Sequence, residues 1–226
     1  ATIMADGKFV RDFRTDIFHD GPPISVDDRG RLRVQNSRPS VGTFQAQWVH
    51  FDLQGNRLDS LLPPEAVKAK TWDAKIPGGA MSMNVPFAPQ NAYAFFDDGS
   101  VVYAGQDRYQ FFVTRDGIDT TRIFGRSDVA AEAIPTALRD SMIDRYSTQT
   151  ALQGVFNAND VPKTYGLWNE LAVDGSGDTW VSRGRKEAGT LRFDVFDPGG
   201  QHLGAVAPPF DTFWRTSWTG NQVAVV

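Results

Sequence analysis

The stretch LAVDGSGDTWVSRG at residues 171–184, followed by FDVFDPGGQHLGAV at residues 193–206, decides the fold. Its apolar runs are short and rich in β-branched and aromatic side chains, which favour strands. Asp and Gly residues lie between the first two runs and between the last two, where they supply side-chain hydrogen bonds and positive φ angles to tight turns. The stretch predicts antiparallel strands at Glu170–Val173, Thr179–Ser182, Arg192–Phe196 and His202–Val206.

The same order of strands and turns occurs twice more, earlier in the chain. One copy predicts strands at Ile24–Asp27, Arg31–Gln35, Gln45–Phe51 and Arg57–Leu62. Another predicts strands at Tyr93–Phe96, Val101–Gly105, Tyr109–Thr114 and Thr120–Phe124. Half-units flank these copies, with strands at Thr2–Met4 and Phe9–Phe13 at the start and at Phe213–Trp218 and Gln222–Val226 at the end. Such repetition is typical of repeat architectures.

Two insertions separate the repeated units, at residues 63–90 and 125–166. Insertions in repeat proteins fall in connecting loops, because the strands themselves must keep their pairing. The second insertion predicts a helix over Thr136–Ser147, in which one face carries Leu138, Met142, Ile143 and Tyr146. The first insertion, interrupted by Pro-Pro and Gly-Gly pairs, is predicted to be mostly irregular.

Repeated four-stranded antiparallel units predict an all-β fold, and a β-propeller rather than a β-sandwich, because a sandwich has no reason to repeat two turn chemistries in one order. We expect one propeller domain over residues 1–226, with one inserted helix between blades. Three units and two halves make about four blades, so the chain is expected to be part of a longer ring. A stand-alone four-bladed ring, closed by joining the two half-units, is the alternative.

Several hairpins resemble those of the bacterial NHL-like six-bladed β-propellers. They are MADGKFVRDF at residues 4–13, FDLQGNRLDSL at 51–61, TRDGIDTTRIF at 114–124 and the stretch at 171–206. The resemblance covers most of the chain, but its motifs specify architecture and carry no chemistry. It implies a six-bladed ring, and relatives of this kind also carry inserted helices between late blades.

Composition narrows the classes of function. A net charge of −4 without a basic stripe argues against a nucleic-acid partner. The chain has no cysteine, which excludes disulfides and thiolate metal sites and fits an oxidising compartment, so a periplasmic or extracellular location is expected. No apolar run approaches the roughly 20 residues that span a bilayer. Membrane association is therefore expected only through partners or through an anchor outside this sequence.

One turn carries the strongest candidate for a metal site. Asp174, Ser176 and Asp178 have the alternating oxygen spacing that begins a calcium loop, and calcium prefers hard oxygen ligands. The corresponding turns hold Asp27-Asp28 and Asp97-Asp98, where a hairpin needs only turn chemistry. A purely structural turn is thus the alternative to calcium, and no other cofactor is expected.

No catalytic residues are assigned. The three histidines, His19, His50 and His202, form no close pair, and the Gly-x-Ser-x-Gly pattern of serine hydrolases is absent from the sequence. The nearest enzymatic comparison is with gluconolactonase-like propellers, which bind a divalent cation in the central channel through Glu, Asn and Asp. By residue type alone, Glu170, Asn169 and Asn91 could supply such ligands.

Apolar side chains in the first insertion suggest an interaction patch made of Trp72, Met81, Met83 and Phe87. The alternative is that these residues form a small satellite core covering the edge of the propeller. The expected function is a non-catalytic scaffold or accessory subunit that binds other protein subunits. A divalent-metal-dependent hydrolase or lactonase with its site in the channel is one alternative, and a sensor of small ligands is another.

Overall fold

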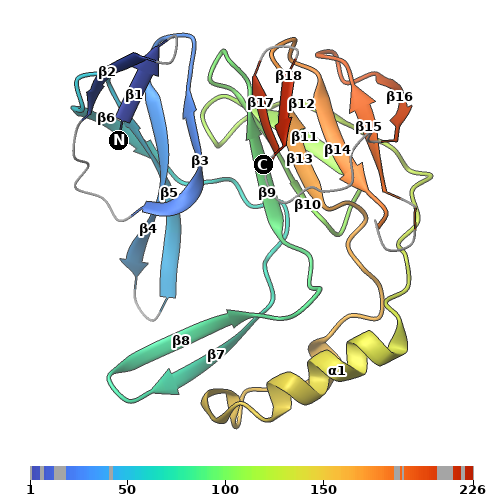
Figure 1. Ribbon diagram of the computed structural model, residues 1–226. Coiled ribbons are helices and arrows are strands. Elements are labelled where there is room, and N and C mark those ends of the chain that lie inside the picture. Colours follow the sequence, from blue (N-terminus) through green and yellow to red (C-terminus); the bar gives the residue numbers. More distant parts are fainter. Residues whose placement is uncertain are drawn as a thin grey trace. The chain divides into compact units, whose positions relative to one another are not determined.

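The structure is a computed structural model that describes residues 2–5, 8–12, 19–40, 43–185, 189, 191–207, 216–219 and 222–225 (Figure 1). It divides into two compact units. Unit 1 holds residues 1–63 with Asp97–Gly99, and unit 2 holds residues 64–96 with residues 100–226. Most of the regular structure is antiparallel strand, and the described residues contain one α-helix. Within them, no helix is long and apolar enough to cross a membrane.

Unit 1 contains a four-stranded antiparallel meander and a separate hairpin. The strands of the meander follow the order β3 (His19–Val26), β4 (Leu32–Ser40), β5 (Thr43–Phe51) and β6 (Arg57–Leu61). The hairpin pairs β1 (Thr2–Ala5) with β2 (Lys8–Asp12). A small core on the meander is formed by Leu32, Val34, Val49 and Phe51. These strands confirm the first predicted unit and the half-unit before it, although Phe13 lies outside the described residues.

Unit 2 contains two such meanders and a hairpin near its end. The first meander consists of β9 (Asn91–Phe95), β10 (Val101–Gly105), β11 (Gln110–Thr114) and β12 (Thr120–Gly125). The second consists of β13 (Glu170–Val173), β14 (Thr179–Arg183), β15 (Arg192–Phe196) and β16 (His202–Val206). The hairpin pairs β17 (Thr216–Thr219) with β18 (Gln222–Val225). The remaining predicted units are confirmed, although residues 213–215 and 226 lie outside the described residues.

The two meanders of unit 2 share one hydrophobic core. The rings of Phe111, on β11, and Phe124, on β12, lie 5.8 Å and 5.1 Å from the ring of Phe196, on β15. Trp168 and Val181 are buried in the same cluster. The first strands of the two meanders, β9 and β13, lie side by side (Figure 1). Aromatic packing between faces thus joins consecutive meanders.

The first insertion contains a β-hairpin, so its prediction as a mostly irregular segment is wrong. Strand β7 (Thr71–Ile76) pairs with β8 (Gly79–Asn84) across the turn Pro77-Gly78. Gly78 has a φ of +86°, which suits the third position of a Pro-Gly turn. Along β7, Trp72 and Ala74 are buried and the residue between them is exposed. This alternation is the pattern of a half-buried strand.

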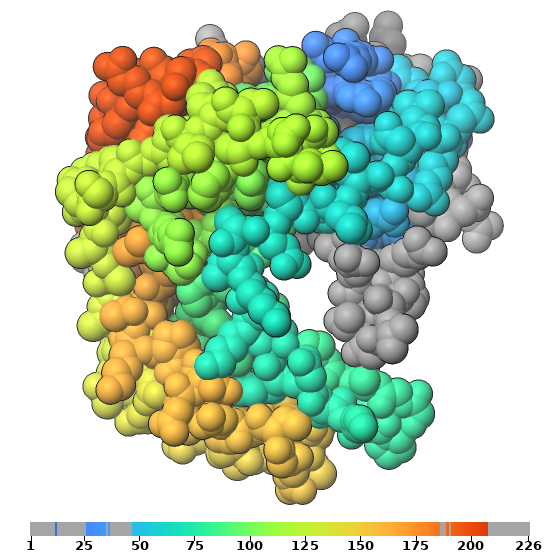
Figure 2. Space-filling model, turned by 180° about the vertical axis from the view of Figure 1, so that it is seen from behind, coloured from blue at the N-terminus to red at the C-terminus, as the bar shows by residue number. Residues whose placement is uncertain are grey.

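The second insertion contains the predicted helix, α1 (Thr136–Ser147), followed by the short 3-10 helices η1 (Thr150–Leu152) and η2 (Ala158–Asp160). The two insertions pack on each other, as Figure 2 shows along the lower edge of the molecule. Ile143 and Tyr146, from the predicted apolar face of α1, contact the core that contains Trp72. We call residues 70–88 and 134–165 the insertion module.

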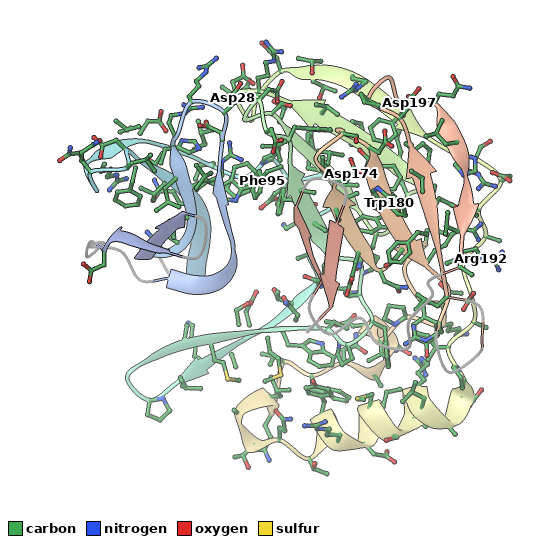
Figure 3. The ribbon with its side chains drawn as sticks, turned by 45° about the horizontal axis from the view of Figure 1, so that its top comes forward. Asp28, Phe95, Asp174, Trp180, Arg192 and Asp197 are labelled. Carbon is green, nitrogen blue, oxygen red and sulfur yellow. The ribbon has the colours of Figure 1, made fainter. Side chains whose placement is uncertain are left out.

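The two ends of the meander β13–β16 carry different kinds of segment. Because its strands alternate in direction, the turns Asp174–Asp178 and Asp197–Gln201 lie at one end, which we call the turn end (Figure 3). The β14–β15 loop and the connection that enters β13 lie at the other, the connection end. The insertion module belongs to the connections that join consecutive meanders.

Candidate functional site

The predicted calcium ligands lie in the turn between β13 and β14. Asp174 Oδ1 accepts hydrogen bonds from the backbone N–H groups of Ser176, at 2.9 Å, and Asp178, at 3.0 Å. Asp174 Oδ2 accepts from the indole Nε1 of Trp180 at 2.9 Å (Figure 3). Burial, together with the negative charges of Asp174 and Asp197, raises the pKa of Asp178. Both carboxylate oxygens of Asp174 therefore serve to close its own hairpin.

The same hydrogen bonding occurs at other turns. In each of Asp27, Asp52 and Asp197, Oδ1 accepts from the backbone N–H four residues further on, at 2.8 Å. Turn closure alone thus explains why these positions carry Asp. The described residues contain no group of three or more His, Cys, Asp or Glu side chains placed to hold one ion. Calcium at Asp174, Ser176 and Asp178 stays a prediction.

The predicted interaction residues lie together in the insertion module. Trp72 is buried, and Met81, Met83 and Phe87 are half-buried around it. The other buried members of this core are Val85, Ala88, Leu152 and Val161. The indole of Trp72 also packs against the rings of Tyr146, at 5.5 Å, and Phe156, at 5.0 Å. These contacts form a small satellite core, which was the alternative to an interaction patch. Binding of a partner by the outer surface of this core stays a prediction.

Polar bonds fasten the two halves of the insertion module. Trp72 Nε1 donates to Asp160 Oδ2 at 3.1 Å, and Lys70 Nζ lies 2.8 Å from Asp160 Oδ1. The hydrogen bond from Lys70 is the main reason that the pKa of Asp160 is lowered. Within the second half, the guanidinium of Arg139 donates to three backbone carbonyls in residues 158–162. The module is thus held by specific bonds as well as by apolar packing.

His50 is engaged through both of its ring nitrogens. It is buried on β5, where Arg33 Nε donates to its Nε2 at 2.9 Å, so the ring proton lies on Nδ1 and faces the carboxylate of Asp59. Arg33 also donates to the carbonyl of Gly99 at 2.8 Å. Burial lowers the pKa of Arg33 to about 10 and lowers that of His50 as well. Because no lone pair of the imidazole is available, His50 acts as a structural link.

The remaining histidines have different surroundings. His202 Nε2 lies 3.3 Å from Arg126 Nη1 and 3.6 Å from Asp194 Oδ1, and its ring lies 5.2 Å from that of Phe196. It therefore lies at the edge of a charged cluster between the meanders of unit 2. The side chain of His19 lies outside the described part of the chain.

A buried carboxylate, which the sequence analysis missed, forms the centre of that cluster. Asp194 is 0% exposed, and its Oδ2 accepts from Tyr109 Oη at 2.6 Å, Arg183 Nε at 2.7 Å and Arg126 Nη1 at 3.3 Å. Burial alone would raise the pKa of Asp194. The hydrogen bonds from Arg183 and Tyr109 and the two guanidinium charges outweigh burial, so the pKa is lowered. Burial and the hydrogen bond to Asp194 raise the pKa of Tyr109.

The residues considered as channel ligands make bonds within the connections. Asn91 Oδ1 accepts from the backbone N–H groups of Ala66, at 2.9 Å, and Val67, at 3.0 Å, while its Nδ2 donates to the carbonyl of Val67. Asn169 Nδ2 donates to the backbone carbonyl of residue 184 at 2.8 Å. Glu170 is exposed at the start of β13. Asn91 and Asn169 thus position backbone segments.

A small pocket lies at the connection end of the meander β13–β16. Its lining includes Arg183 and Arg185 at the end of β14, Tyr165 and Asn169 before β13, and Glu132. Its cavity volume is about 30 Å³. At roughly 10–15 Å³ for each water, this is room for about two water molecules. Two arginines on one small pocket make it a candidate binding site.

Comparisons with protein families and with curated sequences give no match for this chain. Functional inference therefore depends on the contacts described above.

Proposed function

We propose that the chain forms part of a β-propeller in which its meanders are successive blades. Propeller blades are four-stranded antiparallel sheets repeated around a central channel. Three observations support the proposal: the three meanders have one strand order, β9 and β13 lie side by side, and aromatic residues pack between the faces of the meanders in unit 2. Membership of a six-bladed NHL-like ring is part of the same proposal.

The proposed role is that of a protein-interaction scaffold or accessory subunit, with the insertion module as its docking element. The observation that carries this role is the shared core around Trp72, which joins two insertions from separate connections into one body. Loops held by a rigid scaffold are where proteins most often place their binding residues. The exposed face of α1 is polar and includes Asp140, Asp144 and Arg145. A partner would therefore meet a firm, charged helix surface.

The hydrogen bonds that the candidate catalytic and metal-binding side chains already make also favour a scaffold role over catalysis. His50 uses both ring nitrogens, Asp174 uses both carboxylate oxygens, and Asn91 is bonded to backbone through its amide. His50 would have to break a bond within its own unit before it could act on a substrate, and Asn91 would have to do so before its amide oxygen could bind a channel cation. The alternative of a metal-dependent hydrolase therefore requires local rearrangement.

The test is the native mass of the particle that carries this chain, isolated gently from its source. We expect partner subunits at a fixed stoichiometry. Reversing the charges of Asp140 and Asp144 to Arg should release a partner that contacts α1, whereas Asp119→Arg, at another exposed acidic residue in the β11–β12 turn, should not. A particle with the mass of one chain plus a divalent cation would refute the scaffold role and favour the hydrolase.

A further inference from the structure

The arginine pocket at the connection end has a defined geometry, because stacking on an aromatic ring fixes the orientation of one of its arginines. The Cζ of Arg185 lies 3.4 Å from the centroid of the Tyr165 ring. At that distance the guanidinium must lie flat on the ring, since a tilted one would push a nitrogen into it. Its N–H groups therefore point outward in a plane parallel to the ring. Arginine combines such stacking with recognition of anions.

Tyr165 is itself held from two sides. Its ring meets that of Phe87 edge-on at 5.6 Å, and its backbone N–H donates to the carbonyl of Glu132 at 2.9 Å. Phe87 has a φ of +61°, a left-handed conformation that non-glycine residues rarely adopt. Such strained residues persist where the surroundings over-determine them, and they cluster at binding sites. The insertion module thus supports the platform on which Arg185 lies.

The second cation of the pocket, Arg183, is oriented by the buried carboxylate. Arg183 uses Nε and Nη2 to bind Asp194, at 2.7 and 3.3 Å. Its Nη1, with two further N–H donors, bonds to none of the described residues. Asp194 is buried and also binds Arg126. The group that orients Arg183 is therefore part of the interior and not a flexible surface side chain.

We propose that this pocket binds a carboxylate group through Arg183 and Arg185. Arginine pairs with carboxylates through parallel N–H···O bonds, and about 30 Å³ of space suits a flat two-oxygen head group whose remainder extends into solvent. Glu132 also lines the pocket. The limited space suits a flat carboxylate better than a tetrahedral phosphate. The carboxylate comes from a small acid or from the C-terminus of a peptide.

The test follows the arginine Nε–H signals of the intact chain by NMR at constant ionic strength. The probes are acetate, inorganic phosphate, and one short peptide with either a free or an amidated C-terminus. We expect saturable shifts with acetate and with the free peptide, and none with the amidated peptide. Tighter binding of the free peptide than of acetate would identify a chain end, and equal binding a small acid. Tighter binding of phosphate than of acetate would overturn the proposal.

Variants separate the pocket from general charge effects. Arg185→Gln should weaken acetate binding by about 10-fold, the loss expected for one charge-assisted hydrogen bond. Arg185→Lys keeps the charge but loses the stacked fork, and it should also weaken binding. Arg108→Gln removes the same charge from a side chain that is 73% exposed elsewhere in unit 2 and should change nothing. Equal losses in Arg185→Gln and Arg108→Gln would refute a specific site, whether or not partner subunits are found.

Discussion

Replacing Asp194 with asparagine removes the negative charge on which Tyr109, Arg183 and Arg126 converge. Removing one partner of a buried ion pair costs about 3–5 kcal/mol, because the remaining charge is left without compensation. The side chains of Arg183 and Arg126 are 20% and 22% exposed and so retain some hydration. Arg126 also keeps Asp128, at 2.6 Å. We therefore expect the lower end of the range, a loss of about 3 kcal/mol in the free energy of unfolding.

Urea unfolding, followed by tryptophan fluorescence, measures this loss. Tyr109→Phe keeps the charge and removes only the 2.6 Å hydrogen bond, so it should cost about 1.5 kcal/mol. Asp128→Asn is the matched control, because it removes an exposed carboxylate from the same Arg126 and should change the free energy of unfolding little. If Asp194→Asn costs no more than Asp128→Asn, the reasoning about the buried cluster is refuted.

The dependence on pH gives a second check on the same carboxylate. The folded state lowers the pKa of Asp194, so the stabilisation from its charge is fully present above the unfolded value of about 3.9. It is lost as the pH falls through the folded value. The stability difference between the wild type and Asp194→Asn should therefore stay constant from about pH 7 to pH 5 and shrink below about pH 4. A difference that shrinks above pH 5 would point to another titrating group.

Three further substitutions test the packing of unit 2, each by its urea midpoint. Trp72→Phe removes the bond to Asp160 and part of the ring area, so it should cost about 1–2 kcal/mol; an unchanged midpoint would mean that this bond does not hold the insertion module together. Gly200→Ala places a Cβ 2.7 Å from the Cβ of Phe124 at a φ of +90°, and it should cost about 1–3 kcal/mol unless the meanders separate easily. Arg139→Met leaves three backbone carbonyls without their donor and should lower the free energy of unfolding by about 1–3 kcal/mol. An unchanged midpoint would show that water replaces the guanidinium.

The meanders could be predicted because their determinants are local. At the β5–β6 turn, Asp52 accepts from the backbone N–H four residues on, and Gly55, at a φ of +91°, takes the position that needs a positive φ. The strands on either side then pair with their neighbours in sequence. Each meander thus depends on interactions within short windows, and a repeated Asp/Gly spacing reveals them. The helix α1 could also be predicted from the sequence, because its apolar side chains recur with the helical period.

The hairpin of the first insertion had a local signal that composition obscured. Alternation runs through Trp72, Ala74 and Ile76 and continues through Met81 and Met83 on the paired strand. The segment has only two β-branched residues, Thr71 and Ile76, and its Pro and Gly residues suggested a loop. The turn residues Pro and Gly in fact mark the centre of the hairpin.

The clusters that give unit 2 its candidate site could not be predicted, because their members are distant in sequence. Trp72 and Asp160 are 88 positions apart, and Tyr109 and Asp194 are 85 apart. The single clue was a charged residue within the apolar run of β15, where a lone carboxylate must find partners if it is buried. The sequence identifies that need, but only the packing of the two meanders identifies Arg183 and Arg126 as the partners.

The contrast between the two ends of the meander β13–β16 indicates where specificity can arise. At the turn end, Asp174 and Asp197 close their hairpins by the same backbone bonds, so a substitution there mainly affects folding. At the connection end, chain length and composition vary from one connection to the next, and that end carries the arginine pocket. Variation in the connections leaves the strand pairing intact, because, of the residues that line the pocket, only Arg183 belongs to a ladder, where it pairs with Arg192. A chain built in this way can change the residues of its connection end without changing its meanders.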